Sequence, residues 1–152
     1  MRFLREEIIG EKRFDEAWSQ YIHQWAFKSP RPADFYRTME NSSGMDLQWF
    51  FRGFFEEPMQ LDQAITGLKQ DNESVRITFE NLEDWVCPVD LRLTSQDGSM
   101  HSFKLPVTIW AWSQAHTQSF NLSSPATSVQ IDPRGAYPDI DRTNNDVFNI
   151  RH

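Results

Sequence analysis

The spacing of apolar residues changes along the chain and divides the sequence into two parts near Pro58. Before that point, apolar and aromatic residues recur three or four positions apart, which predicts amphipathic helices. From about Leu61 onward they alternate with polar residues, which predicts β-strands. We therefore expect an α+β fold of two domains, with a helical segment over residues 1–58 and a β-sandwich domain over residues 59–152.

Four short helices are expected in the first part. Residues 1–9 have the pattern of the last turns of a helix, closed by Gly10 in a left-handed cap. The second helix takes Asp15 as its N-cap. The third begins at Pro32, which needs no N–H there, and Asp34 adds favourable negative charge to its first turn. The second helix carries one aromatic face made of Phe14, Trp18, Tyr21, Ile22 and Trp25.

Gly44 is expected to form a left-handed link between the third and fourth helices, because it follows one helix and precedes Asp46, a suitable cap for the next. The fourth helix is expected to point Leu47, Phe50, Phe51 and Phe54 inward.

Arg37 and Arg52 each lie on a predicted helix among acidic residues. They are expected to be solvated partners of Glu40 or Glu56.

Six or seven short antiparallel strands are expected in the second part, which is typical of an immunoglobulin-like sandwich. Residues 61–68 fit a helix or a strand, and we interpret them as an edge strand. Asp97 and Gly98 form a tight hairpin signal, with positive φ expected at both positions. The alternating residues are Val75, Ile77 and Phe79, then Val89, Leu91 and Leu93, then Phe103, Leu105 and Val107, followed by residues 109–112, residues 119–122, and Val129 and Ile131.

Aromatic residues are concentrated in the helical part, where thirteen of the 21 lie within residues 1–58. That is more apolar surface than so short a segment is expected to bury by itself. The net charge of −7 and the lack of a basic stripe disfavour binding to nucleic acid or to anionic membranes. No apolar run is long enough for a membrane span, and the first ten residues do not resemble a signal peptide.

The residues of catalytic and zinc chemistry do not form a recognisable motif. The histidines are His23, His101, His116 and His152, and no two of them are four apart as in H-E-x-x-H. Cys87 stands alone, so an internal disulfide is excluded, and a buried structural thiol is favoured over a nucleophile. We assign no catalytic, cofactor-binding or metal-binding residue in this chain.

Two further sets of residues allow more than one interpretation. Trp110 and Trp112 would share one face of a strand and, with Trp85, could form a stacking platform for sugar rings; the alternative is a core or a domain contact. Asp139 and Asp141, followed by Asn144 and Asn145, offer oxygen ligands for calcium; the alternative is that these residues satisfy turn and backbone groups.

Several motifs in a fixed order resemble a known family. They are Trp25-Ala26-Phe27-Lys28, Pro32-Ala33-Asp34-Phe35, Met39-Glu40, Ser43-Gly44-Met45-Asp46-Leu47 and Trp49-Phe50-Phe51, then Asn81-Leu82, Pro88-Val89, Asp97-Gly98, Leu105-Pro106-Val107, Asp132-Pro133, Tyr137-Pro138-Asp139 and Asn144-Asn145. The first group is similar to the closing helices of the catalytic domain in aminopeptidase N-like gluzincins, and the second group to the β-sandwich domain that follows in a bacterial branch.

The resemblance implies a C-terminal piece of a zinc metallopeptidase. The family's zinc-binding H-E-x-x-H and its catalytic residues lie upstream of the matched segment, so none is carried over to this chain. The expected function is structural and the chain is expected to be inactive alone, with zinc only in the full-length parent. Its expected partners are the missing upstream catalytic domain or a second copy bound through the aromatic helical face. The alternative is a self-standing β-sandwich module that binds a carbohydrate or a protein.

Overall fold

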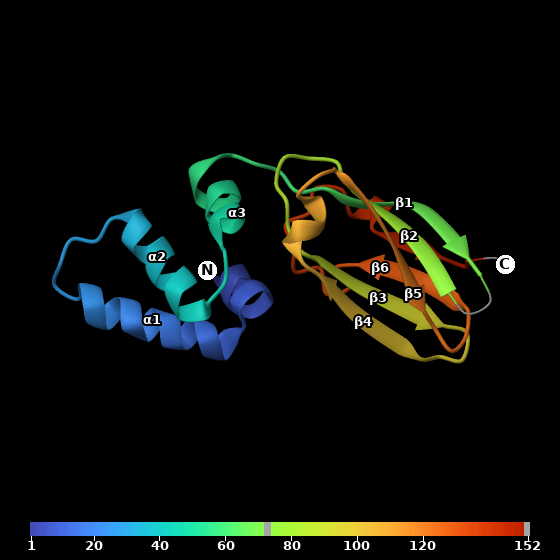
Figure 1. Ribbon diagram of the computed structural model, residues 1–152, viewed down its shortest axis with the longest axis horizontal. Coiled ribbons are helices and arrows are strands. Elements are labelled where there is room, and N and C mark those ends of the chain that lie inside the picture. The colour runs from blue at the N-terminus through green and yellow to red at the C-terminus, as the bar shows by residue number, and fades with distance from the viewer. Residues whose placement is uncertain (72–73, 151–152) are drawn as a thin grey trace. The chain divides into compact units, whose positions relative to one another are not determined.

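The computed structural model describes residues 1–71 and 74–150, and the chain divides into two compact units, Met1–Pro58 and Met59–His152 (Figure 1). The first unit is helical and the second consists mainly of β-strands. The α+β fold class is therefore confirmed.

The helical unit contains five helical segments. They are η1 (Leu4–Ile9), α1 (Glu11–Trp25), α2 (Pro32–Ser43), α3 (Gln48–Phe51) and η2 (Arg52–Glu56). Helices α1 and α2 lie side by side, joined by the loop that runs through Pro30 (Figure 1). Among the residues that the structure describes, no helix is long and apolar enough to cross a membrane.

The start of α1 differs from the prediction. Asp15 is not an N-cap, because α1 already begins at Glu11, directly after Gly10. Gly10 has φ 88° and ψ 143°, which is outside the left-handed helical region, so it turns the chain without forming the predicted cap. Asp15 instead lies inside the helix and accepts a hydrogen bond from Nε of Arg5 at 2.8 Å.

The link between α2 and α3 follows the prediction. Pro32 is the first residue of α2, and Oδ2 of Asp34 accepts a hydrogen bond from the Arg31 backbone N–H at 2.8 Å. Gly44 ends α2 in the left-handed region, with φ 68° and ψ 22°. Asp46 is not the N-cap of α3, because Leu47 occupies that position, but its Oδ1 accepts a hydrogen bond from the backbone N–H of Gln48, the first residue of α3, at 3.1 Å. These local signals determine the geometry because each satisfies backbone groups that a helix end leaves unpaired.

The predicted inward face of the fourth helix is correct for Leu47, Phe50 and Phe51, which are buried, and wrong for Phe54, which is 42% exposed. The helix widens into the π-helical turns of η2 after Phe51. A wider turn changes the angular position of each residue, so Phe54 no longer follows the 3.6-residue repeat.

The second unit consists of two antiparallel sheets. One has the order β1-β2-β5 and the other the order β4-β3-β6-β7. The strands are β1 (Gln63–Gln70), β2 (Ser74–Asn81), β3 (Val89–Ser95), β4 (Met100–Leu105), β5 (Ala115–Asn121), β6 (Ala126–Ile131) and β7 (Asp146–Phe148). The interpretation of residues 61–68 as an edge strand is confirmed from Gln63 onward, because β1 begins there and, among the described strands, pairs with β2 alone.

Alternating residues from both sheets form one hydrophobic core. Ile77 and Phe79 of β2, Leu91 of β3, and Val129 and Ile131 of β6 are almost completely buried. Because side chains of a strand alternate between its two faces, the polar residues between these positions lie on the outer faces.

Two predicted features of this unit are wrong. Residues 109–112 are not a strand, since Val107–Trp110 form the short 3-10 helix η3 after Pro106, which ends β4. At the β3–β4 hairpin, only Gly98 has positive φ, at 84°, so Asp97 does not adopt the predicted conformation. A second 3-10 turn, η4 (Arg142–Asn144), precedes β7.

Candidate functional site

A network of aromatic rings connects the helices of the first unit. The rings of Trp18 and Phe35 pack edge to face with their centroids 6.0 Å apart, which joins α1 to α2. Tyr36 stacks on Phe51 at 4.1 Å, which joins α2 to α3. Such ring pairs add to the stability that burial of apolar area provides. The aromatic residues of this unit therefore hold its helices together, but the network does not bury all of them.

Several large apolar side chains of the helical unit remain exposed. Trp18 and Ile22 lie one turn apart on α1 and are 42% and 48% exposed, and Phe27 is fully exposed in the turn after α1. Phe54 and Phe55 of η2 are also about half exposed. These side chains form the exposed apolar set, which consists of Trp18, Ile22, Phe27, Phe54 and Phe55.

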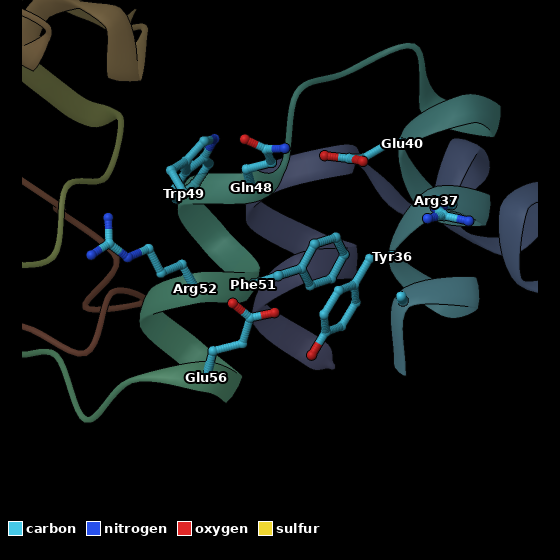
Figure 2. A pocket seen from close by; sticks show the side chains of 9 residues that line it. Tyr36, Arg37, Glu40, Gln48, Trp49, Phe51, Arg52 and Glu56 are labelled. Carbon is cyan, nitrogen blue, oxygen red and sulfur yellow. The ribbon is translucent and has the colours of Figure 1, made fainter. Parts of the chain in front are cut away.

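One hollow of this unit lies between α2 and the α3–η2 segment and has a volume of about 460 Å³ (Figure 2). The stacked rings of Tyr36 and Phe51 lie on one side of it, with Glu56 near the Tyr36 hydroxyl end. Its lining residues are Ala33, Tyr36, Arg37, Glu40, Gln48, Trp49, Phe51, Arg52 and Glu56.

The charged groups of this hollow do not pair as predicted. Oε1 of Glu40 accepts a hydrogen bond from the Leu47 backbone N–H at 3.0 Å. Nε of Arg52 pairs with Glu57 at 2.8 Å and not with Glu56. Arg37 is exposed and forms no ion pair with any residue that the structure describes. The predicted Arg37–Glu40 and Arg52–Glu56 pairs are therefore wrong, because other groups bind Glu40 and Arg52.

The electrostatics of the hollow do not point to acid–base catalysis. Burial raises the pKa of Tyr36, and the negative charge of Glu56 raises it further. A phenol whose pKa lies above its ordinary value stays protonated at neutral pH, so Tyr36 can donate a hydrogen bond but is a poor base. The hollow combines an aromatic wall with two cationic residues, Arg37 and Arg52, and two anionic residues, Glu40 and Glu56.

Sequence reasoning did not single out Tyr36 or Trp49 as lining residues. The only available signal was their position among the aromatic residues of two adjacent helices. A hollow between two helices depends on how the helices cross, which helical periodicity does not specify.

The histidines lie apart from one another. His23 is exposed on α1, His101 lies on β4 and His116 on β5, while His152 is outside the described residues. Within residues 1–71 and 74–150, no group of three or more His, Cys, Asp or Glu side chains is arranged to hold a metal ion.

The proposed tryptophan platform is wrong. Trp85 is 3% exposed and Trp110 is 8% exposed, whereas Trp112 is 98% exposed. Nε1 of Trp110 donates a hydrogen bond of 2.8 Å to the Cys87 carbonyl, so its ring is fixed in the interior. The alternative core interpretation holds for Trp85 and Trp110. The reason is η3, which replaces the predicted strand and turns Trp110 inward and Trp112 outward.

Cys87 is completely buried, and burial raises the pKa of its thiol well above the ordinary value. A thiol that resists ionisation is a weak nucleophile. This geometry fits the structural thiol that the sequence favoured.

The candidate calcium residues have separate roles. Asp141 is the N-cap of η4. Its Oδ1 accepts hydrogen bonds from the backbone N–H and the hydroxyl of Thr143. Asp139 accepts hydrogen bonds of 3.0 Å from the backbone N–H groups of Gln63 and Asp141. Asn144 donates a hydrogen bond to the carboxylate of Asp62. The sequence analysis did not identify Asp62 because it lies 82 positions from Asn144. Asp139, Asp141 and Asn144 therefore bond to separate protein groups, as in the alternative interpretation in which these residues satisfy turn and backbone groups.

Comparisons with known proteins show a similarity of fold to solved structures. No family model and no curated protein sequence matches the chain. The structure is similar to that of aminopeptidase A of Legionella pneumophila, solved in complex with aspartic acid, with a TM-score of 0.61 and 16% sequence identity. The match covers 86% of this chain and 15% of the Legionella chain, so this chain spans a small part of that protein's length.

Proposed function

We propose that this chain is the C-terminal region of an aminopeptidase N-like zinc metallopeptidase, formed by the end of the catalytic lobe and the β-sandwich domain after it. Its role is architectural. The helices complete the wall of a catalytic lobe, and the sandwich supports the geometry of the domains. Zinc and the catalytic residues belong to the upstream part of the parent, and the chain alone has no peptidase activity.

The fold similarity supports this proposal because nearly all of the chain matches a small section of a much larger aminopeptidase. The order of the strands also supports an immunoglobulin-like sandwich. Strands one, two and five form one sheet, and strands four, three, six and seven form the other. This strand order would follow from an immunoglobulin arrangement in which the fourth strand has joined the second sheet.

The exposed apolar set is the observation that carries the architectural role. Half-exposed Trp18 and Ile22 on α1 and Phe54 on η2 would be costly in water and favourable against a protein surface. No specific observation favours the alternative function as a self-standing binding module, because Trp85 and Trp110, which would form its contact surface, are buried.

The gene sequence upstream of the Met1 codon tests the assignment directly. We expect a reading frame that encodes H-E-x-x-H, in frame or separated by a frameshift. An upstream region that encodes no such motif in any frame would contradict the assignment to a metallopeptidase.

Analytical ultracentrifugation and binding of an apolar fluorescent dye test the architectural role. We expect the chain to self-associate or to bind the dye, and the triple variant Trp18→Gln, Phe54→Gln and Phe55→Gln to do neither. Trp112→Gln is the matched control, because Trp112 is exposed but lies in the other unit. A monomeric wild-type chain without dye binding would overturn the idea of an unoccupied interface.

Peptidase assays complete the test of the proposed function. Hydrolysis of aminoacyl p-nitroanilides with added zinc should stay at the level of a blank without protein. Turnover that a chelator abolishes would show that the chain itself is a hydrolase.

A further inference from the structure

The three-stranded sheet of the second unit has an open edge along β5. In the strand order β1-β2-β5, β5 pairs with β2 on one side. At the end of this ladder, the backbone N–H of Asn81 donates to the Gln114 carbonyl at 2.8 Å. Bonded and non-bonded residue pairs alternate along an antiparallel ladder. Thr117, Ser119 and Asn121, at odd numbers of positions from Gln114, therefore direct their backbone N–H and C=O groups to the open edge.

The backbone groups at this edge have no partner among the residues that the structure describes. Within residues 1–71 and 74–150, no hydrogen bond joins the backbone of Thr117, Ser119 or Asn121 to a group beyond the sheet edge. Ala115 differs, because its N–H donates to Oγ of Ser113 at 3.1 Å. The open stretch therefore begins at Thr117, and such a row of ladder groups is a template for another strand.

The edge of β5 lacks the features that protect the other described edge strands. Strand β5 has seven residues and contains no charged residue and no proline. Strand β1 has a bulge between Ile65 and Gly67 and carries Lys69, β4 carries Lys104 and is followed by Pro106, and β7 has three residues. Charges, bulges, prolines and short length all prevent unwanted pairing. Among the described edges, β5 is therefore the one most suited to accept a strand.

The side chain of Arg76 reaches toward this edge. Arg76 of β2 lies opposite Ser119 of β5, and its Nε donates to Oγ of Ser119 at 3.4 Å. The side chain therefore extends from β2 over β5 on the outer face of the sheet. Arg76 is exposed and forms no ion pair with any residue that the structure describes. The terminal nitrogens of its guanidinium can thus donate to an anion at the edge.

A second cation lies beside Arg76. Lys69 of β1 is directly opposite Arg76 on the same face, and it also forms no ion pair within the described part of the chain. Like charges that are directly opposite in a sheet destabilise each other, so an anion here would be favourable. Glu80 of the same face lies further along β2 and accepts a hydrogen bond from Thr66. A hollow of about 380 Å³ on this face is lined by Gly67, Leu68, Lys69, Arg76, Thr78 and Thr117.

We propose that the β5 edge binds an extended peptide segment that carries an acidic side chain. The backbone of the segment would pair with Thr117 and Ser119 as an added strand. Neighbouring strands lie about 4.8 Å apart, so an acidic side chain opposite Ser119 would lie within reach of the Arg76 guanidinium. A second copy of β5 fits this edge less well, because β5 contains no acid to neutralise Arg76. This inference does not depend on the proposed function.

Amide hydrogen exchange of the full chain, followed by NMR, tests the added strand. The probe is a blocked peptide as long as β5, in which threonine and valine alternate around one central glutamate. The peptide should slow exchange of the Thr117 and Ser119 amides, because it provides acceptors for them. The Gln118 amide already bonds to β2, so its exchange should not change.

Fluorescence anisotropy with the labelled peptide tests the charge of the partner. A peptide with glutamine in place of glutamate should bind about threefold more weakly or worse, because the ion pair with Arg76 is lost. Arg76→Gln should weaken the glutamate peptide by the same factor and leave the glutamine peptide unchanged. Arg92→Gln is the matched control and should affect neither peptide, because Arg92 lies opposite Ser102 at the edge of the other sheet.

A proline substitution tests the backbone pairing. Thr117→Pro removes an N–H that points to the open edge and does not bond to β2, so it should abolish peptide binding. If this variant fails to fold, the wild-type chain can be tested with a peptide that is methylated on the amide nitrogens facing β5. That peptide should not bind, because it cannot donate to the Thr117 and Ser119 carbonyls.

Three results would overturn the proposal. One is unchanged exchange of the Thr117 and Ser119 amides with millimolar peptide. Another is equal affinity for the glutamate and glutamine peptides, which would exclude an acidic partner. The third is a wild-type dimer that protects the same two amides without peptide, which would show that a second copy occupies the edge.

Discussion

The two units of this chain differ in how completely they bury their aromatic residues, although each leaves some exposed, such as Phe27 in the helical unit and Trp112 in the β unit. The β unit closes a core in which Ile77, Leu91 and Val129 are completely buried. The helical unit buries Phe50 and Leu47 equally well but leaves the exposed apolar set in contact with solvent. Both units have regular secondary structure. They differ in how much of the apolar surface of each helix or strand is buried against another element of the same unit.

The difference follows from size and geometry. The inner faces of the three-stranded and the four-stranded sheet pack against each other, so the apolar side chains on both inner faces are buried in one core. Helices of 15 and 12 residues carry aromatics around more than one face, and a unit of 58 residues has too little interior to cover them. The helical unit therefore depends less on a closed interior than the β unit does.

The largest predicted effect concerns the closed core. Leu91→Ala removes a completely buried side chain and should lower the free energy of unfolding of the β unit by about 2–5 kcal/mol. Chemical denaturation followed by the β-sheet circular dichroism signal measures this loss.

Phe54→Ala is the matching change in the helical unit. Because Phe54 is 42% exposed, its removal should cost less than about 1.5 kcal/mol, measured by the same denaturation with the helical signal. An equal loss for both variants would break the contrast between the closed and the open unit.

A smaller effect is predicted for the turn that brings α3 against α2. Gly44→Ala places a side chain at φ 68°, and should destabilise the helical unit by about 1 kcal/mol. A Cβ atom at this position meets no other atom within 4 Å, so the cost comes from the backbone alone. Gly44→Asn should recover part of the loss, because asparagine tolerates the left-handed region. Equal thermal melts for Gly44→Ala and Gly44→Asn would contradict the backbone origin of the cost.

The smallest predicted effect is the pH dependence of the Arg5–Asp15 ion pair. The hydrogen bond from Arg5 lowers the pKa of Asp15 below its ordinary value. The unfolded state therefore binds the proton more readily, and the stabilisation is present above the ordinary pKa of an aspartate and is lost as pH falls through the lowered value. Helical thermal melts between neutral and acidic pH should show this loss in the wild type and not in Asp15→Asn. Because the pair is exposed, salt should weaken it, and an acid transition that is unchanged in Asp15→Asn would exclude this origin.

Local patterns predicted much of the fold. The alternation at Val75, Ile77 and Phe79 identified β2 and its buried face, and the sequence around Gly44 identified the link between two helices. Both signals act within a few residues, through side-chain alternation and through backbone conformation. The start of α1 and the path after Pro106 were predicted wrongly, because Arg5 provided a distant partner for Asp15 and η3 replaced a strand.

The candidate sites were much less accessible to sequence reasoning. The hydrogen bond between Asn144 and Asp62 could not be predicted from the sequence. The β-bridge between Leu61 and Asp139 is what brings these two segments together. The hollow beside Tyr36 likewise depends on the packing of α2 against α3. No local pattern reports contacts between residues that are tens of positions apart.

The sequence by itself determined the spacing of apolar residues, and so the helical and the β part of the chain. It also determined the glycines and prolines at which helices and strands end, since these depend on local stereochemistry. The tertiary structure alone decided which aromatics lie in a core and which remain exposed, and which acids lie together. Burial and the clustering of charge depend on the packing of distant segments, and that packing places Trp110 inside, Trp112 outside, and Asp62 beside Asp139.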